Sequence, residues 1–241
     1  VYVALFAAIA GIAAAREWHR MVGEPVFGPA FFITSIATVA ALAAKLFAPV
    51  LLAPYAIIVG GAVVAAIYAA LRGHYPAWHG FGAIYIALPA LALVLLRDVP
   101  NGAWIIVGMF LAIWSTDTGA LITGNIVGGP RLWPAISPSK TGAGTLGGIA
   151  LAAIVEAIFI KVLGGNIVFA AMFGASVAVI SVAGDLFESW VKRAFQRKDS
   201  GGLIPGHGGV LDRIDSTLAT APLLALAVLV FGLNPLFGAH P

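Results

Sequence analysis

The sequence has no cysteine and little charge, since Asp, Glu, Lys and Arg make up only 10% of its 241 residues. Without cysteine the chain can form neither a disulfide framework nor a thiolate metal site, and its redox compartment stays open. A soluble domain carries about 25% charged residues, so this chain has too few to cover a surface that faces water. The composition therefore argues against a water-soluble domain.

Apolar residues are correspondingly abundant. Hydrophobic residues make up 61% of the chain, the mean hydropathy is +1.02, and apolar runs of about 20 residues, the length that crosses a bilayer, recur along it. We expect an all-α, polytopic integral membrane protein that forms one domain over residues 1–241, without internal repeats. Its eight predicted membrane-spanning helices are 1–15, 29–48, 50–71, 80–96, 102–123, 145–163, 167–187 and 217–237.

The ends and the loops predict how the chain sits in the membrane. The chain begins inside an apolar run with no basic segment before it, so we expect no signal peptide, a truncated first helix and a natural N-terminus upstream. Ten of the thirteen Lys and Arg residues lie in the loops of one side, and only Lys45, Arg97 and Lys161 lie near the other. The loops 124–144 and 188–215 share the basic side, which predicts that both face the cytoplasm.

Charge is concentrated in one segment. Half of the ten acidic residues and five of the thirteen basic residues lie between Asp185 and Asp215. Asp185, Ser189 and Lys192 are spaced i, i+4 and i+7, so a helix that leaves the membrane would carry them on one face. The other face is apolar, which predicts an interfacial helix that continues to Lys198.

A glycine-rich loop and two carboxylates follow this helix. Five glycines lie within residues 201–209 and expose backbone N–H groups that suit phosphate oxygens, although a flexible connector would also explain the glycines alone. Asp212 and Asp215 follow at i and i+3 where the last span begins, and helix capping would explain one of them. Together with Asp185 the two carboxylates predict a Mg²⁺ site, because Mg²⁺ binds hard oxygens alongside substrate phosphates.

A second polar loop, 115–144, supports the first. Asp117 lies near the cytoplasmic end of its span, where a carboxylate is costly enough to indicate function. The run SPSKTGAG adds Lys140, hydroxyls and glycines as phosphate partners, although a solvated lysine in a Ser-Pro turn is the ordinary alternative.

Other polar residues are not assigned to the site. Glu156 lies in the middle of a span and could pair with a neighbouring helix. The histidines outside the glycine loop show no metal-ligand spacing on a helix; they are His19, His74, His79 and His240.

The assigned residues suit phosphate chemistry at the membrane edge. Carboxylates with Mg²⁺ and basic side chains neutralise the charge on a reacting phosphate. The sequence has no Ser-His-Asp arrangement, no cysteine nucleophile and no Walker loop. The interfacial position predicts one lipid substrate and one soluble phosphate compound, which fits both a lipid phosphotransferase and a nucleotidyltransferase.

The run SWVKRAFQRKDSGGLIPGHGGVLDRID, from Ser189 to Asp215, resembles the signature of the phosphatidate cytidylyltransferase family. GDLFES around Asp185, DTGA around Asp117 and SPSKT around Lys140 are also similar to that family. The resemblance implies transfer of CMP from CTP to phosphatidic acid, which yields CDP-diacylglycerol and pyrophosphate for phospholipid biosynthesis. It further implies Mg²⁺, with or without a second cation, and a homodimer in the bacterial inner membrane, with no nucleic-acid partner.

Site roles follow from the residues and from this resemblance. Catalytic roles are assigned to Asp185, Lys192 and Asp212, and metal binding to Asp185, Asp212 and Asp215. Substrate binding is assigned to Asp117, Lys140, Ser189, Arg193, Lys198, Asp199, His207 and Arg213.

Two other functions remain as alternatives. A CDP-alcohol phosphotransferase also uses aspartates at a membrane edge, but its D-G-x2-A-R…G-x3-D-x3-D array does not occur in this sequence. An ion-coupled transporter would use Asp117, Glu156 and Asp185 as ion ligands within the membrane. The concentration of charge in one loop, and the lack of paired interrupted helices, argue against the transporter.

Overall fold

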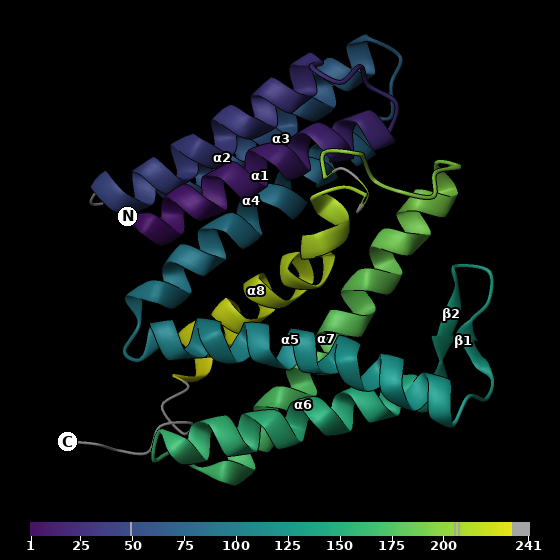
Figure 1. Cartoon of the computed structure of the whole chain (residues 1–241). Helices are drawn as coiled ribbons and strands as arrows, with labels where there is room; N and C mark the ends of the chain where they lie inside the picture. The colour runs from purple at the N-terminus through teal and green to yellow at the C-terminus, as the bar shows by residue number, and fades with distance from the viewer. Residues whose placement is uncertain (49, 205, 207, 233–241) are drawn as a thin grey trace. The chain divides into compact units, whose positions relative to one another are not determined.

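The computed structural model describes residues 1–48, 50–204, 206 and 208–232, so His207 and His240 lie outside the described residues. The described residues form eight helices and one two-stranded sheet (Figure 1). The elements are α1 (Tyr2–Met21), α2 (Pro29–Phe47), α3 (Ala53–Leu71), α4 (Pro76–Asp98), α5 (Gly102–Ile126), β1 (Arg131–Trp133), β2 (Ser137–Thr141), α6 (Gly142–Val162), α7 (Ile167–Ala194) and α8 (Leu211–Phe231).

Seven of these helices, α2 to α8, are long and apolar enough to cross a membrane, and α1 is not among the seven. The prediction of an all-α, polytopic integral membrane protein is confirmed. The expected first span, 1–15, is part of a longer helix whose last turn carries His19 and Arg20.

Several helices extend beyond the apolar runs that predicted them. α4 begins at Pro76 rather than at residue 80, because proline fits the first turn of a helix, where its missing N–H is not needed. α8 begins at Leu211 rather than at residue 217, and Glu17 Oε2 accepts the Leu211 N–H, which has no partner within the helix, at 2.8 Å. α7 extends beyond its predicted span but ends at Ala194, before Lys198, where the predicted interfacial helix ends. Gln196 follows in the left-handed conformation, which is typical of a helix C-terminus.

The loop after α5 contains a small hairpin that the sequence analysis did not predict. β1 and β2 pair antiparallel, with Arg131 opposite Thr141. Thr141 also caps α6, since its Oγ1 accepts the N–H of Gly144 at 3.0 Å. The hairpin thus fixes where α6 begins, and it positions the neighbouring Lys140.

The chain folds into two compact units. The first contains residues 1–95 and 191–214, and the second contains residues 96–190 and 215–241. In the first unit a buried apolar core joins α2, α3 and α4 through Ala41, Ile58, Ala87 and Leu91. The single domain expected from the sequence stays a prediction.

In the second unit, α5 and α6 lie side by side and pack through glycines (Figure 1). A Cβ on Gly148 would lie 2.5 Å from the Thr116 carbonyl oxygen, and one on Gly119 would lie 2.8 Å from the Gly147 carbonyl oxygen. Small residues allow such close approach between membrane helices. This packing brings the second half of α5 next to the beginning of α6.

Candidate active site

Asp185 belongs to a cluster of polar side chains in the second unit. Lys140, from β2, forms an ion pair with Asp185 Oδ2, and the Ser189 hydroxyl donates a hydrogen bond to Asp185 Oδ1 at 3.2 Å. Asp117 on α5 lies close enough to interact electrostatically with both Asp185 and Lys140. The structure therefore brings together four assigned residues from α5, β2 and α7.

A polar pocket of about 530 Å³ adjoins this cluster, and two of the four residues line it. Its lining includes Asp117, Lys140 and Arg131, together with Thr141 and Gly144 at the start of α6. Two basic side chains, hydroxyls and the N-terminus of a helix provide the hydrogen-bond donors and positive charge that phosphate oxygens require. The pocket is thus suited to the phosphate chain of a nucleotide.

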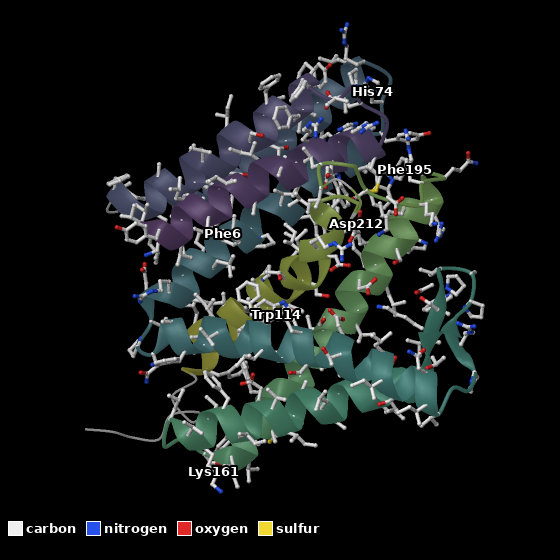
Figure 2. The ribbon with its side chains drawn as sticks, viewed as in Figure 1. Phe6, His74, Trp114, Lys161, Phe195 and Asp212 are labelled. Carbon is white, nitrogen blue, oxygen red and sulfur yellow. The ribbon has the colours of Figure 1, made fainter. Side chains whose placement is uncertain are left out.

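Asp212 lies in the first unit and has a lysine partner of its own. Lys192 Nζ lies 2.7 Å from Asp212 Oδ1, and the two side chains are only 13% and 14% exposed. Asp212 Oδ2 accepts the N–H groups of Ser200 at 3.1 Å and of Gly209 at 2.9 Å. The carboxylate therefore holds both ends of the glycine loop at the start of α8, where Figure 2 labels it. The N–H groups that Asp212 accepts precede α8, so this role differs from the helix capping that the sequence analysis weighed against metal binding.

Glu17 on α1 also holds the loop, and the sequence analysis missed it. Its side chain is 1% exposed, and its Oε2 accepts the Leu211 N–H at 2.8 Å and the Ser200 hydroxyl at 3.4 Å. A Cβ on Gly209 would lie 2.5 Å from the same oxygen, so glycine is needed there for close approach. The only signal in the sequence is a carboxylate at the polar end of the first apolar run.

The glycine loop borders a second polar pocket, of about 260 Å³, in the first unit. Asp199 and Ser200 line it together with Arg20 and Arg197. Arginine can bind phosphate through two parallel hydrogen bonds, so this pocket also offers a place for an anionic group. Neither arginine was assigned from the sequence.

The other assigned residues lie at the surface or at a helix end. Arg193, Lys198 and Arg213 are exposed. Asp215 Oδ1 accepts the N–H of the next residue at 2.6 Å. The predicted role of His207 falls outside the described residues and stays a prediction.

The chemistry of the donors fits Mg²⁺ at both aspartates. Asp185 and Asp212 are carboxylates, the ligands that Mg²⁺ prefers, and a positively charged lysine already lies beside each of them. The two aspartates belong to different compact units, so a metal ion shared by Asp185 and Asp212 stays a prediction.

Glu156 does not make the polar contact with a neighbouring helix that its sequence position suggested. It is fully buried on α6, and neither carboxyl oxygen has a hydrogen-bond partner among the described residues. A Cβ on Gly108 would lie 2.9 Å from Glu156 Oε2, and one on Gly174 would lie 2.8 Å from Glu156 Cγ. Because these positions on α5 and α7 are glycines, the Glu156 side chain can pack directly against the backbones of both helices.

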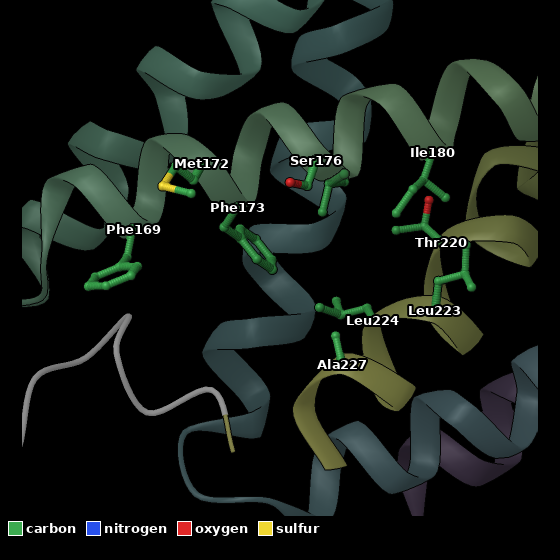
Figure 3. Close-up of a pocket in the computed structure, with 10 residues that line it drawn as sticks. Phe169, Met172, Phe173, Ser176, Ile180, Thr220, Leu223, Leu224 and Ala227 are labelled. Atoms are coloured by element: carbon green, nitrogen blue, oxygen red, sulfur yellow. The ribbon is translucent and has the colours of Figure 1, made fainter. Parts of the chain in front are cut away.

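An apolar pocket of about 350 Å³ lies between α7 and α8 in the second unit (Figure 3). Phe169, Phe173 and Leu224 are among the side chains that line it, and its polar groups are the hydroxyls of Ser176 and Thr220. Because its described lining carries no charge, this pocket suits a hydrocarbon chain rather than a nucleotide.

Comparison with known proteins shows the family to which the chain belongs. A sequence model described as "Cytidylyltransferase family" matches residues 1–231. A phosphatidate cytidylyltransferase of Brucella suis biovar 1 (strain 1330) is 45% identical over 158 residues, which cover 64% of this chain and 58% of the relative.

Two relatives from other bacteria carry the same name. That of Rickettsia bellii (strain RML369-C) is 39% identical over 151 residues, covering 59% of this chain and 65% of the relative. That of Bacillus subtilis (strain 168) is 38% identical over 152 residues, covering 62% and 56%. The chain thus spans less than two thirds of the length of these relatives. Because the family model matches nearly the whole sequence, the chain belongs to the cytidylyltransferase family.

Proposed function

We propose that the chain transfers CMP from CTP to phosphatidic acid and so forms CDP-diacylglycerol and pyrophosphate. Family membership and the names of the relatives support this reaction. The structural observation that carries the proposal is the pairing of each key aspartate with a lysine, Asp185 with Lys140 and Asp212 with Lys192. Both pairs adjoin groups that suit phosphate, namely a polar pocket in one unit and the glycine loop in the other.

In this reaction an anionic phosphate oxygen of phosphatidic acid attacks the α-phosphorus of CTP. The bond between the α-phosphorus and the oxygen that bridges to the β-phosphate breaks, and pyrophosphate leaves with the electron pair. The nucleophile is already an anion, so the protein needs neither a covalent intermediate nor a base to activate it. What the chain must supply is positive charge and orientation.

The polar residues divide these tasks. Lys140 and Lys192 would turn from their aspartates toward phosphate oxygens when substrates bind, and the exposed Arg193, Lys198 and Arg213 would add positive charge. Asp185, Asp212 and Asp215 would hold Mg²⁺, with or without a second cation, which supplies charge neutralisation on the nucleotide and on the leaving pyrophosphate. The apolar pocket between α7 and α8 offers a surface for an acyl chain.

We also propose the cellular setting of the reaction. The excess of Lys and Arg on one side of the predicted spans supports a site that faces the cytoplasm. The bacterial relatives support the inner membrane as location, and the family resemblance supports a homodimer.

Radiolabelled CTP tests the reaction directly. We expect purified protein in detergent to convert phosphatidic acid and labelled CTP into a chloroform-soluble liponucleotide when Mg²⁺ is present. No such product, with CTP left intact, would refute the proposed reaction. Labelled CDP-diacylglycerol supplied with an alcohol tests the phosphotransferase alternative in the same assay.

Two isosteric variants test the aspartates. Asp185→Asn and Asp212→Asn each remove one carboxylate charge, and we expect each to lower kcat by at least about 1,000-fold, or ~4 kcal/mol. Arg97→Ala, at the end of α4, should leave the rate unchanged. Near-normal rates in monodisperse aspartate variants would contradict the metal assignment while leaving the reaction itself untouched.

A further inference from the structure

Three buried polar side chains meet in the first unit, apart from every residue assigned to the reaction. His19 comes from the last turn of α1, Glu24 from the connection to α2, and His79 from the first turn of α4. Their side chains are buried, at 0%, 4% and 0% exposure. One ligand atom from each lies within 4.8 Å of the other two.

The two imidazoles are held in a fixed arrangement. His19 Nδ1 lies 2.8 Å from His79 Nδ1, and the ring planes are parallel within 1°. The other nitrogen of His19, Nε2, lies 2.7 Å from the hydroxyl of Thr34, which is fully buried on α2. Histidines that bind metals commonly engage an oxygen with the second ring nitrogen, which fixes the ring. His19 already has this second partner.

Two polar atoms of the cluster have no partner. His79 Nε2 and Glu24 Oε2 are buried and make no hydrogen bond to any described residue. The other oxygen of Glu24 accepts the N–H of Ala30 at 3.0 Å, so the carboxyl group is anchored from one side only. An unsatisfied buried polar group costs about 1–3 kcal/mol, and an ion bound by the two Nδ1 atoms would satisfy the Glu24 oxygen but not His79 Nε2.

We propose that His19, Glu24 and His79 bind one divalent transition-metal ion of the zinc class. Two imidazole nitrogens and one carboxylate are typical ligands of Zn²⁺, whereas Mg²⁺ prefers oxygen ligands alone. Tetrahedral ligand atoms about 2.0–2.1 Å from an ion lie about 3.3–3.4 Å apart, so the two Nδ1 atoms, which are 2.8 Å apart in their hydrogen bond, would separate by about half an ångström when an ion replaces that bond. Three protein ligands leave a coordination position open for water.

Such an ion would have a structural role. It would join the end of α1, the α1–α2 connection and the start of α4 within the first unit. Glu17, which holds the glycine loop, lies two residues before His19 on α1. A metal ion at His19 would therefore also fix the part of α1 from which Glu17 reaches the loop.

Metal content tests this proposal without any activity measurement. The full chain is purified without a histidine tag, treated with chelator, and dialysed against a slight excess of Zn²⁺ in the presence of millimolar Mg²⁺. We expect about one zinc ion per chain by mass spectrometry of the metal. His79→Gln and Glu24→Gln should each weaken binding at least about tenfold.

Two controls separate this site from other sources of zinc. His74→Gln should keep full zinc content, because the His74 ring centroid lies 6.0 Å from that of His79 and His74 does not belong to the ligand group. Asp185→Asn should also keep it, since the proposed Mg²⁺ site is made of other residues. Loss of activity in Asp185→Asn with zinc retained would show that the zinc site and the proposed reaction are tested independently of each other.

X-ray absorption at the zinc edge of the wild-type protein keeps the test independent of how the variants fold. Scattering from two imidazoles with nitrogen or oxygen neighbours is expected. Absence of stoichiometric zinc, equal zinc in His79→Gln, or a spectrum without imidazole would each overturn the proposal and leave a hydrogen-bonded histidine pair.

Discussion

Glu17 holds the glycine loop through two buried hydrogen bonds, and their loss can be measured. Glu17→Gln keeps the shape but removes the charge. A hydrogen bond to a charged group contributes about 1.5–3 kcal/mol to stability, and a neutral one contributes about 0.5–1.5 kcal/mol. The bonds to Leu211 and Ser200 should therefore weaken by about 1–2 kcal/mol together, and the longer Ser200 bond should contribute less of this loss. Glu17→Leu removes both acceptors and leaves buried donors unsatisfied, which should cost about 2–6 kcal/mol.

Hydrogen exchange in lipid nanodiscs reports this loosening locally. Each 1.4 kcal/mol corresponds to a tenfold change, so amides of residues 200–211 should exchange about tenfold faster in Glu17→Gln and about 100-fold faster or more in Glu17→Leu. Glu156→Gln is the matched control, because Glu156 is similarly buried and neither of its carboxyl oxygens has a hydrogen-bond partner among the described residues. Unchanged exchange of the loop in Glu17→Leu would refute the assignment of Glu17 as its anchor.

Two further predictions concern the site and the packing of the second unit. Lys192→Met should lower kcat/KM for CTP about 100-fold, or ~2.7 kcal/mol, because it removes the positive charge beside Asp212. Lys161→Met at the end of α6 is the control, and equal rates in the two variants would contradict a role of Lys192 in binding phosphate. Gly148→Leu should destabilise the protein by about 1–3 kcal/mol in thermal unfolding, since a side chain at this position meets the α5 backbone. Gly60→Leu is the control and should be nearly neutral, because the space around Gly60 is open. Similar losses of stability in both variants would argue against close packing of α5 and α6.

The sequence predicts the helices well because the bilayer imposes a minimum apolar length on each of them. Boundaries differ where a polar group acts on the backbone, as Glu17 does when it accepts the N–H of Leu211 at the start of α8. The hairpin of β1 and β2 escapes prediction because each strand is so short, at three and five residues, that no alternating pattern develops.

Site residues were predictable where the chemistry is local. Asp185 and Ser189 are one helical turn apart, so spacing alone places them together. Glu17 contacts a residue 194 positions away, and His19 meets His79 across 60 positions. No periodicity connects such residues, because packing between segments decides which of them meet. Lys140 is an intermediate case, since its loop was recognised but its partner was not.

The length of α7 has a consequence for where the proposed reaction would take place. Its 28 residues span about 42 Å, whereas the hydrocarbon core of a bilayer measures about 30 Å. An upright α7 is therefore about eight residues too long, and residues 187–194, with Ser189 and Lys192, would stand in the headgroup layer. A lipid phosphate occupies that same layer, so phosphatidic acid would meet these side chains by lateral diffusion alone, with its acyl chains still in the membrane.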